Sequence, residues 1–225
     1  MTRAPARLAH ALLLDLDGTL LDTAPDMSAA LNEMLREAGR EALAAETIRH
    51  HVGYGTAALI RLGFGTPPRD EFERLSRRFL EIYSNNVSVH TRLFDGFEGL
   101  LRTLEIAGIP WGVVTNKPGY LTAKLLAAQA LNARASCVVA GDTVSQQKPH
   151  PLPLLHAASL ISRSPADCLY VGDAERDIQA GRAAGMQTVV ARFGYLGPTD
   201  DPHSWGPDWI IDDPRELSAW LALPA

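Results

Sequence analysis

Several polar side chains stand directly after short apolar runs, at a spacing that could support catalysis. Asp15 and Asp17 follow the run ALLL, Thr115 and Asn116 follow WGVV, and Asp173 follows CLYVG. Apolar runs without polar alternation are typical of buried strands in a parallel sheet. Because ligands bind at the carboxyl ends of such strands, we expect these five side chains to converge on one site.

The residue types at this predicted site favour chemistry at a phosphoryl group. Asp177 stands four residues after Asp173 and could face the same site. Several carboxylates in one crevice repel each other and need a compensating cation. Oxygen ligands suit Mg²⁺, while Lys148 could reach an anion from a helix start. The set supports attack of one carboxylate on phosphorus, with a second carboxylate moving the proton.

Four motifs, in this order along the chain, carry a resemblance to a known superfamily. They are DLDGT at residues 15–19, Thr115, Lys148, and GDAERD at residues 172–177. On these motifs the chain resembles the haloacid dehalogenase-like (HAD) hydrolases over essentially its whole length. Within that superfamily it is similar to the phosphoglycolate phosphatase group, which has a helical cap inserted after the first strand.

The resemblance implies a role for each acidic residue. Asp15 would be the nucleophile that forms an aspartyl-phosphate, and Asp17 would protonate the leaving alcohol and then activate water. Mg²⁺ would be held by the Asp15 carboxylate, the Asp17 main-chain carbonyl and Asp173. Asp177 would support the metal site from behind or through water. Many relatives have serine where this chain has Ala174. Alanine at this position weakens one supporting contact to the site but leaves the reaction intact.

The same resemblance assigns the phosphoryl oxygens to Thr115, Asn116 and Lys148. Lys148 would in addition reduce the repulsion between the carboxylates. The residues alone also allow other interpretations: Thr115 could cap the following helix, and Lys148 could be a solvated charge in a loop. Asp177 could simply favour the first turn of its helix.

The expected substrate is a small phosphorylated metabolite, with 2-phosphoglycolate as the first candidate. The segment HVGYGT at residues 51–56 resembles the cap loop that faces the substrate in phosphoglycolate phosphatases. Arg49 and Arg61 could pair with a substrate carboxylate. The segments VHTRLFDG, WGVVTNKP and SWGPDW also resemble bacterial N-acetylmuramic acid 6-phosphate phosphatases, so a sugar phosphate is the main alternative.

Other function classes fit the residues less well. A phosphonate hydrolase of this superfamily needs a cap lysine, and residues 22–92 contain none. A haloacid dehalogenase needs neither Asp17 nor a Mg²⁺ site. A phosphoacceptor signalling domain also surrounds a phosphorylated aspartate with acids, threonine and lysine, but it is shorter, has no cap and lacks an acid–base residue such as Asp17. The intact motifs disfavour a catalytically silent binding module.

Alternation of apolar runs with helical patterns predicts an α/β fold, a Rossmann-like doubly wound parallel sheet. The expected strands are residues 11–15, 111–115, 137–140, 169–171, 188–191 and 209–211, and the expected core helices are 97–107, 120–131, 151–161 and 176–184. Helical patterns alone occupy the long segment between them, at residues 28–38, 44–50, 56–62 and 69–83. We therefore expect a hydrolase core of residues 1–21 and 93–225 and an α-helical cap of residues 22–92, hinged near Asp22 and Arg92.

Composition excludes several classes of partner. The chain has 225 residues, 46% hydrophobic and 21% charged, with a net charge of −5, which argues against a nucleic-acid or membrane partner. The first apolar run is interrupted by Asp15 and is therefore too short for a signal peptide, and no run approaches the ~20 residues of a bilayer span.

Cys137 and Cys168 lie in apolar runs without metal-like spacing, so we expect reduced thiols and a cytoplasmic protein. Adjacent His50 and His51 do not predict a metal site, and the choice between monomer and homodimer stays open.

Overall fold

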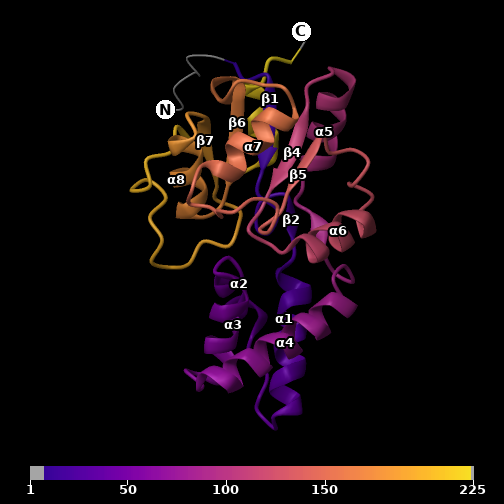
Figure 1. The fold of residues 1–225 in the computed structure, drawn as a ribbon, viewed down its shortest axis with the longest axis vertical. Helices are drawn as coiled ribbons and strands as arrows, with labels where there is room; N and C mark the ends of the chain where they lie inside the picture. The colour runs from indigo at the N-terminus through magenta and orange to yellow at the C-terminus, as the bar shows by residue number, and fades with distance from the viewer. Residues whose placement is uncertain (1–7, 224–225) are drawn as a thin grey trace.

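The computed structural model describes residues 8–223. Six strands form one parallel sheet in the order β5-β4-β1-β6-β7-β8 (Figure 1). Their bounds agree with the six predicted strands to within one residue at each end, and the predicted Rossmann-like α/β fold is confirmed. The strands are β1 (Ala11–Leu14), β4 (Trp111–Val114), β5 (Cys137–Val139), β6 (Cys168–Gly172), β7 (Gln187–Ala191) and β8 (Trp209–Ile211).

Both faces of this sheet are covered, which explains why the strands show no polar alternation. Leu12 and Leu14 pack in one cluster with α5 (Phe97–Ile106) and α6 (Gly119–Ala128), whereas Leu13 packs in another with α7 (Leu152–Leu160) and α8 (Glu175–Ala183). Successive strand residues point to opposite faces, so a strand buried on both sides must be apolar throughout. Cys137 and Cys168 are buried free thiols, as predicted. A 3₁₀ helix at Pro214–Trp220 follows β8.

The winding of the chain reverses at β1. From β1 the chain proceeds to β4 and β5 on one side, and β6, β7 and β8 then follow on the other side. In such a sheet the crevice outside the carboxyl ends of the strands at the reversal is the usual place for a ligand. Asp15, Thr115 and Asp173 each follow one of the three strands that meet there, which are β1, β4 and β6.

A helical insert occupies the long segment between β1 and α5, as predicted. It contains α1 (Ala24–Glu37), α2 (Ala45–Val52), α3 (Gly55–Phe64) and α4 (Arg69–Asn85), which form a lobe beyond this edge of the sheet (Figure 1). Two short strands, β2 (Leu21–Asp22) and β3 (Arg92–Leu93), pair antiparallel at the ends of the insert. The sequence did not indicate these strands, yet they place the two connections of the lobe side by side.

Helix α1 begins at Ala24, four residues before the predicted start at residue 28. Pro25 stands in its first turn, where a missing N–H costs nothing. The hydroxyl oxygen of Tyr195 accepts hydrogen bonds from the N–H groups of Thr23 (2.6 Å) and Ala24 (2.9 Å). A side chain remote in sequence therefore caps this helix, and no local pattern could indicate it.

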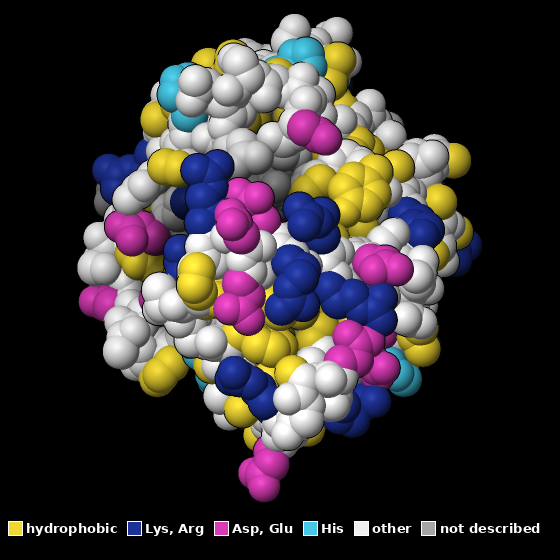
Figure 2. All heavy atoms as spheres, turned by 60° about the horizontal axis from the view of Figure 1, so that its bottom comes forward, with side chains coloured by type: hydrophobic (Ala, Val, Ile, Leu, Met, Phe, Trp, Pro, Cys, Tyr) yellow, Lys and Arg dark blue, Asp and Glu magenta, His cyan; other side chains and the backbone are white. Residues whose placement is uncertain are grey.

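Basic and acidic side chains alternate on the surface of the insert, and Figure 2 shows both signs interleaved on the face turned toward the viewer. Ion pairs join Arg69 to Glu73 (3.0 Å), Arg74 to Glu71 (3.6 Å) and Arg78 to Glu81 (2.8 Å) along α4. Because these pairs place both signs side by side, this face is neither uniformly positive nor uniformly negative. Each exposed pair contributes little stability. Among residues 8–223, no helix combines the length and the apolar character that crossing a membrane would require.

Candidate active site

Asp15 lies directly after β1, and only 3% of it is exposed. The N–H of Leu16 donates to its Oδ1 over 2.7 Å, and Lys148 Nζ lies 2.9 Å from the same oxygen. Gly18 turns the chain here with φ +80°, and a Cβ at this position would overlap the Asp173 carboxylate. Glycine therefore lets the backbone pass close to Asp173 while Asp15 faces the crevice.

Lys148 is buried at the centre of this arrangement, so its interpretation as a solvated loop charge is wrong. Its Nζ lies 2.7 Å from Asp177 Oδ1 and donates to Val114 O and Tyr170 Oη, each at 2.9 Å. The Asn116 side chain hydrogen bonds to both the N–H (3.0 Å) and the C=O (2.9 Å) of Lys148. Since an ammonium has three N–H donors, these acceptors and Asp15 already engage them all. This geometry favours charge compensation over direct contact with a phosphoryl oxygen.

Thr115 follows β4 at the crevice and is 4% exposed. Its Oγ1 accepts a hydrogen bond from the N–H of Lys117 over 3.2 Å. Pro118, and not Thr115, is the N-cap residue of α6, so the alternative that Thr115 caps the next helix is wrong. Thr115 and Asn116 both line the main cavity, where the predicted phosphoryl group would bind.

Asp15, Asp173 and Asp177 form a buried acidic triad whose oxygens lie within 4.8 Å of one another. The N–H of Tyr195 donates to Asp173 Oδ2 over 2.8 Å, and the N–H of Ala174 donates to Asp177 Oδ2 over 3.1 Å. This oxygen-only donor set fits a hard divalent cation. Asp177, predicted only as a supporting residue, therefore lies within the group that could hold the metal.

Burial and neighbouring charges shift the pKa values of the three carboxyl groups in the acidic triad. Burial, reinforced by Asp15 and Asp177, raises the pKa of Asp173 to about 7. Burial also raises the pKa of Asp15, because it outweighs the opposing effect of Lys148. Lys148 and Arg176 together overcome burial at Asp177, whose pKa is lowered. A divalent cation bound beside Asp173 would lower this pKa and keep the carboxylate ionised.

Asp17 is held by a residue whose role the sequence analysis missed. Lys117 Nζ donates to Asp17 Oδ1 over 2.8 Å, and Thr23 Oγ1 donates to the same oxygen over 2.6 Å. Lys117 also lies over the ring of Tyr83 from α4, 4.7 Å from its centroid. Burial disfavours the charged form of Lys117, but the effects of Asp17 and Tyr83 are larger in sum, so the pKa of Lys117 is raised. The signal was available, because Lys117 is one of only three lysines and stands two residues after Thr115.

A cavity of about 410 Å³ lies between the sheet edge and the insert. Residues 53–56 of the predicted cap loop line it, as expected. The two arginines suggested for a substrate carboxylate do not: Arg49 pairs with Asp22 at 2.8 Å, and Arg61 lies 5.8 Å from the ring centroid of Phe72. The lining residues are Asp15, Asp17, Met27, Val52, Gly53, Tyr54, Gly55, Thr56, Phe79, Leu80, Tyr83, Thr115, Asn116, Lys117, Pro118, Leu121, Gln147 and Arg176.

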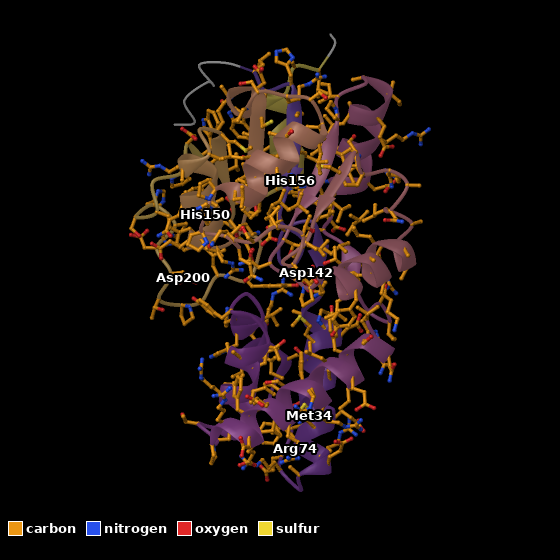
Figure 3. All side chains as sticks on the ribbon, viewed as in Figure 1. Met34, Arg74, Asp142, His150, His156 and Asp200 are labelled. Carbon is orange, nitrogen blue, oxygen red and sulfur yellow. The ribbon has the colours of Figure 1, made fainter. Side chains whose placement is uncertain are left out.

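Two surface aspartates flank the crevice without entering this cavity. Figure 3 shows Asp142 and Asp200 on the edge of the core that faces the insert. Asp142 Oδ1 accepts a hydrogen bond from the N–H of Gly119 over 2.9 Å, and Tyr54 Oη donates to Asp200 Oδ1 over 3.1 Å. The contact between Tyr54 and Asp200 joins the cap loop to the loop after β7.

Comparisons with known proteins agree with this geometry. Residues 12–191 match the family of haloacid dehalogenase-like hydrolases. The chain is 44% identical over 217 residues to a phosphoglycolate phosphatase of Xanthomonas campestris pv. campestris, covering 95% of this chain and 98% of that one. It is 41% identical over 209 residues to an N-acetylmuramic acid 6-phosphate phosphatase of Pseudomonas putida, covering 92% and 94% of the two chains.

Solved structures show the same fold. A crystal structure from Haemophilus somnus, of a predicted phosphoglycolate phosphatase, superposes with a TM-score of 0.84 at 26% identity and covers 95% of this chain and 98% of that one. The match to the family spans well over half of the chain and includes Asp15, Thr115, Lys148 and Asp173. The chain therefore belongs to the haloacid dehalogenase-like hydrolases, as an enzyme similar to the phosphoglycolate phosphatases.

Proposed function

We propose that the chain is a Mg²⁺-dependent phosphomonoester hydrolase that works through an aspartyl-phosphate intermediate. One observation carries this proposal: Asp15 and Asp17 open onto the same cavity as Thr115. Behind the cavity wall, Lys148, Asp173 and Asp177 supply the charges that such a reaction needs.

In the first half of the reaction, a carboxylate oxygen of Asp15 attacks phosphorus and the bond from phosphorus to the ester oxygen breaks. Asp17 gives its proton to that oxygen, so an alcohol leaves. Thr115 and Asn116 line the cavity where the phosphoryl oxygens would be held. Lys148 fixes the Asp15 carboxylate through the contact at 2.9 Å.

In the second half, water attacks the phosphorus of the aspartyl-phosphate and the bond to Asp15 breaks, which releases inorganic phosphate. Asp17, now ionised, takes the proton from this water. Lys117 and Thr23 hold the Asp17 carboxylate at the cavity wall through contacts of 2.8 and 2.6 Å. An acid–base group two residues from the nucleophile disfavours a signalling domain that stores the phosphoryl group.

The residues that would hold Mg²⁺ are Asp15, Asp173 and the main-chain carbonyl of Asp17, with Asp177 in support. When bound, the ion would neutralise developing charge on the phosphoryl oxygens. The close approach of the Asp15, Asp173 and Asp177 carboxylates, each with an oxygen within 4.8 Å of the others, supports this assignment because oxygen ligands suit a hard divalent cation.

We propose 2-phosphoglycolate as the substrate, since the 44%-identical relative is a phosphoglycolate phosphatase. The size of the cavity favours a second candidate, N-acetylmuramic acid 6-phosphate, because about 410 Å³ with a partly apolar wall exceeds the needs of a two-carbon acid. The apolar part of the wall comprises Met27, Val52, Phe79, Leu80 and Leu121. Both candidates are phosphate esters of a hydroxyl group, and both also carry a free carboxylate.

The first experiment replaces Asp15 with asparagine. Asp15→Asn should abolish phosphatase activity in the presence of Mg²⁺ while leaving the melting temperature near that of the wild type, because asparagine fills the same space without the nucleophilic charge. The exposed Asp201→Asn is the matched control and should keep full activity. Normal turnover by Asp15→Asn would overturn the nucleophile assignment.

Measuring kcat/KM across a panel of phosphate esters distinguishes the two substrates, and the lifetime of the phospho-enzyme distinguishes a phosphatase from a signalling domain. We expect kcat/KM to be highest for 2-phosphoglycolate, with N-acetylmuramic acid 6-phosphate as the competing result. Rapid quenching should show a short-lived phospho-enzyme. A long-lived adduct without turnover of any ester would instead indicate a phosphoacceptor domain.

A further inference from the structure

Arg176 differs from the other cations around the cavity. Within residues 8–223, Lys117 and Arg176 line the cavity and Lys148 lies behind it. Lys117 is paired with Asp17, and Lys148 is paired with Asp15 and Asp177. Arg176 makes no ion pair with a carboxylate in the part of the chain that the structure describes, and its Nε is buried without a hydrogen-bond partner.

A buried guanidinium N–H without an acceptor is unfavourable, because the group has lost water and gained nothing in return. Arginine remains charged in proteins, and the nearby Asp177, Asp15 and Asp173 stabilise that charge without contacting it. A cationic fork that lines a substrate cavity and lacks its acceptor is a binding group for an anion.

Arg176 lies between the acidic triad and the cap loop. Arg176 is the second residue of α8, and it lines both the main cavity and an adjoining one of about 230 Å³. Gly53 and Tyr54 of the cap loop line the adjoining cavity together with Asp173 of the acidic triad, and neither Thr115 nor Asn116 lines it. Arg176 therefore stands on the side of the cavity toward the cap loop, where the part of a substrate remote from phosphorus would lie.

We propose that Arg176 binds a carboxylate of the substrate, and that the enzyme acts on phosphomonoesters that carry such a group. This inference rests on the proposed function and adds its substrate class. The planar guanidinium can donate two parallel N–H bonds to a carboxylate. A single negative charge is also better tolerated here than a second phosphate, because the acidic triad lies close by.

Matched substrate pairs test the proposal. The first pair is 2-phosphoglycolate and 2-hydroxyethyl phosphate, which has CH₂OH in place of the carboxylate. The second pair is N-acetylmuramic acid 6-phosphate and N-acetylglucosamine 6-phosphate, which lacks the lactyl acid. For whichever acid the wild type prefers, Arg176→Gln should lower kcat/KM about 10- to 100-fold more than for its carboxylate-free partner, mainly through KM.

Two further variants make the result specific. Arg176→Lys keeps the charge but loses the fork, so it should recover part of the discrimination. Arg102→Gln removes an exposed arginine on α5 and should leave both members of each pair unchanged. Melting temperatures check that each variant is folded.

The outcomes separate this inference from the function on which it rests. Equal losses on both members of a pair would show that Arg176 acts on the phosphoryl group or only balances the acidic triad, and would overturn the inference while the phosphatase stands. If the wild type hydrolyses no phosphomonoester at all, the proposed function fails and this inference fails with it.

Discussion

Asp173 shows at the scale of one residue how a site can oppose stability. Its pKa in the folded protein is about 7, against an ordinary value of 3.8. Between these two values the folded state binds more protons than the unfolded state, so this group makes the free energy of unfolding fall as pH rises. The metal-free protein therefore keeps this carboxylate at a cost that a bound cation would offset.

We predict that Asp173→Asn stabilises the metal-free protein at high pH. Asparagine cannot ionise, yet its side-chain oxygen can still accept the hydrogen bond from Tyr195 N–H. Relative to wild type, the free energy of unfolding should increase by about 3 kcal/mol between pH 5 and pH 8. Urea unfolding in the presence of a chelator measures this difference.

Two controls frame the Asp173 prediction. Added Mg²⁺ should stabilise the wild type and not Asp173→Asn, because the variant lacks a ligand. Asp201→Asn should follow the wild type at every pH, since Asp201 is exposed. Parallel pH profiles for wild type and Asp173→Asn would show that Asp173 does not titrate as described.

Individual residues differ in how far the sequence could predict them. Asp15, Asp17 and Thr115 were predictable because each stands in a local motif at the end of an apolar run. Lys117 and Arg176 stand within the same segments, but their roles depend on which neighbours hold ion-pair partners. That information exists only after strands remote in sequence are brought together.

At the scale of elements, the junction between the core and the insert is organised by one tyrosine of the core. The Tyr195 hydroxyl accepts from the first N–H groups of α1 and donates to Asp22 Oδ1 over 3.0 Å. Asp22 in turn pairs with Arg49 of α2. Since the N–H of Tyr195 also donates to Asp173, this residue joins the start of the insert to the acidic triad.

We predict that Tyr195→Phe destabilises the protein by about 2–3 kcal/mol, because the buried N–H groups of Thr23 and Ala24 lose their acceptor. Chemical unfolding of the two proteins at pH 7 gives this value. Tyr120→Phe is the matched control, since Tyr120 is 54% exposed and its substitution should change little. An unfolding free energy equal to that of the wild type would mean that other groups cap α1.

Elements were more predictable than the contacts between them. The six strands could be located because burial on both faces leaves an unbroken apolar run. The early start of α1 and the pairing of β2 with β3 could not, since each depends on a partner remote in the chain. Local patterns thus specified the framework, and the tertiary fold specified how the insert is attached to it.

The whole molecule consists of a core and an insert that share the cavity, contribute to one apolar cluster and meet at polar contacts. Lys124 Nζ donates to Ser84 O over 2.7 Å, and the His50 ring contacts Leu196 O over 2.7 Å. The two short strands β2 and β3 are the connections between the parts. This narrow pair of connections favours relative motion of the insert and the core.

We predict that the insert closes over the core when Mg²⁺ and a phosphate analogue such as vanadate bind together, because closure would exclude water from the reacting phosphorus. Small-angle scattering should then report a smaller radius of gyration than for the protein alone. Mg²⁺ without vanadate is the control, since the metal by itself gives the insert nothing new to contact. Superimposable scattering curves with and without both ligands would instead favour a rigid molecule, in which Tyr83 and the cap loop already stand at their working distance from Asp15 and Asp17.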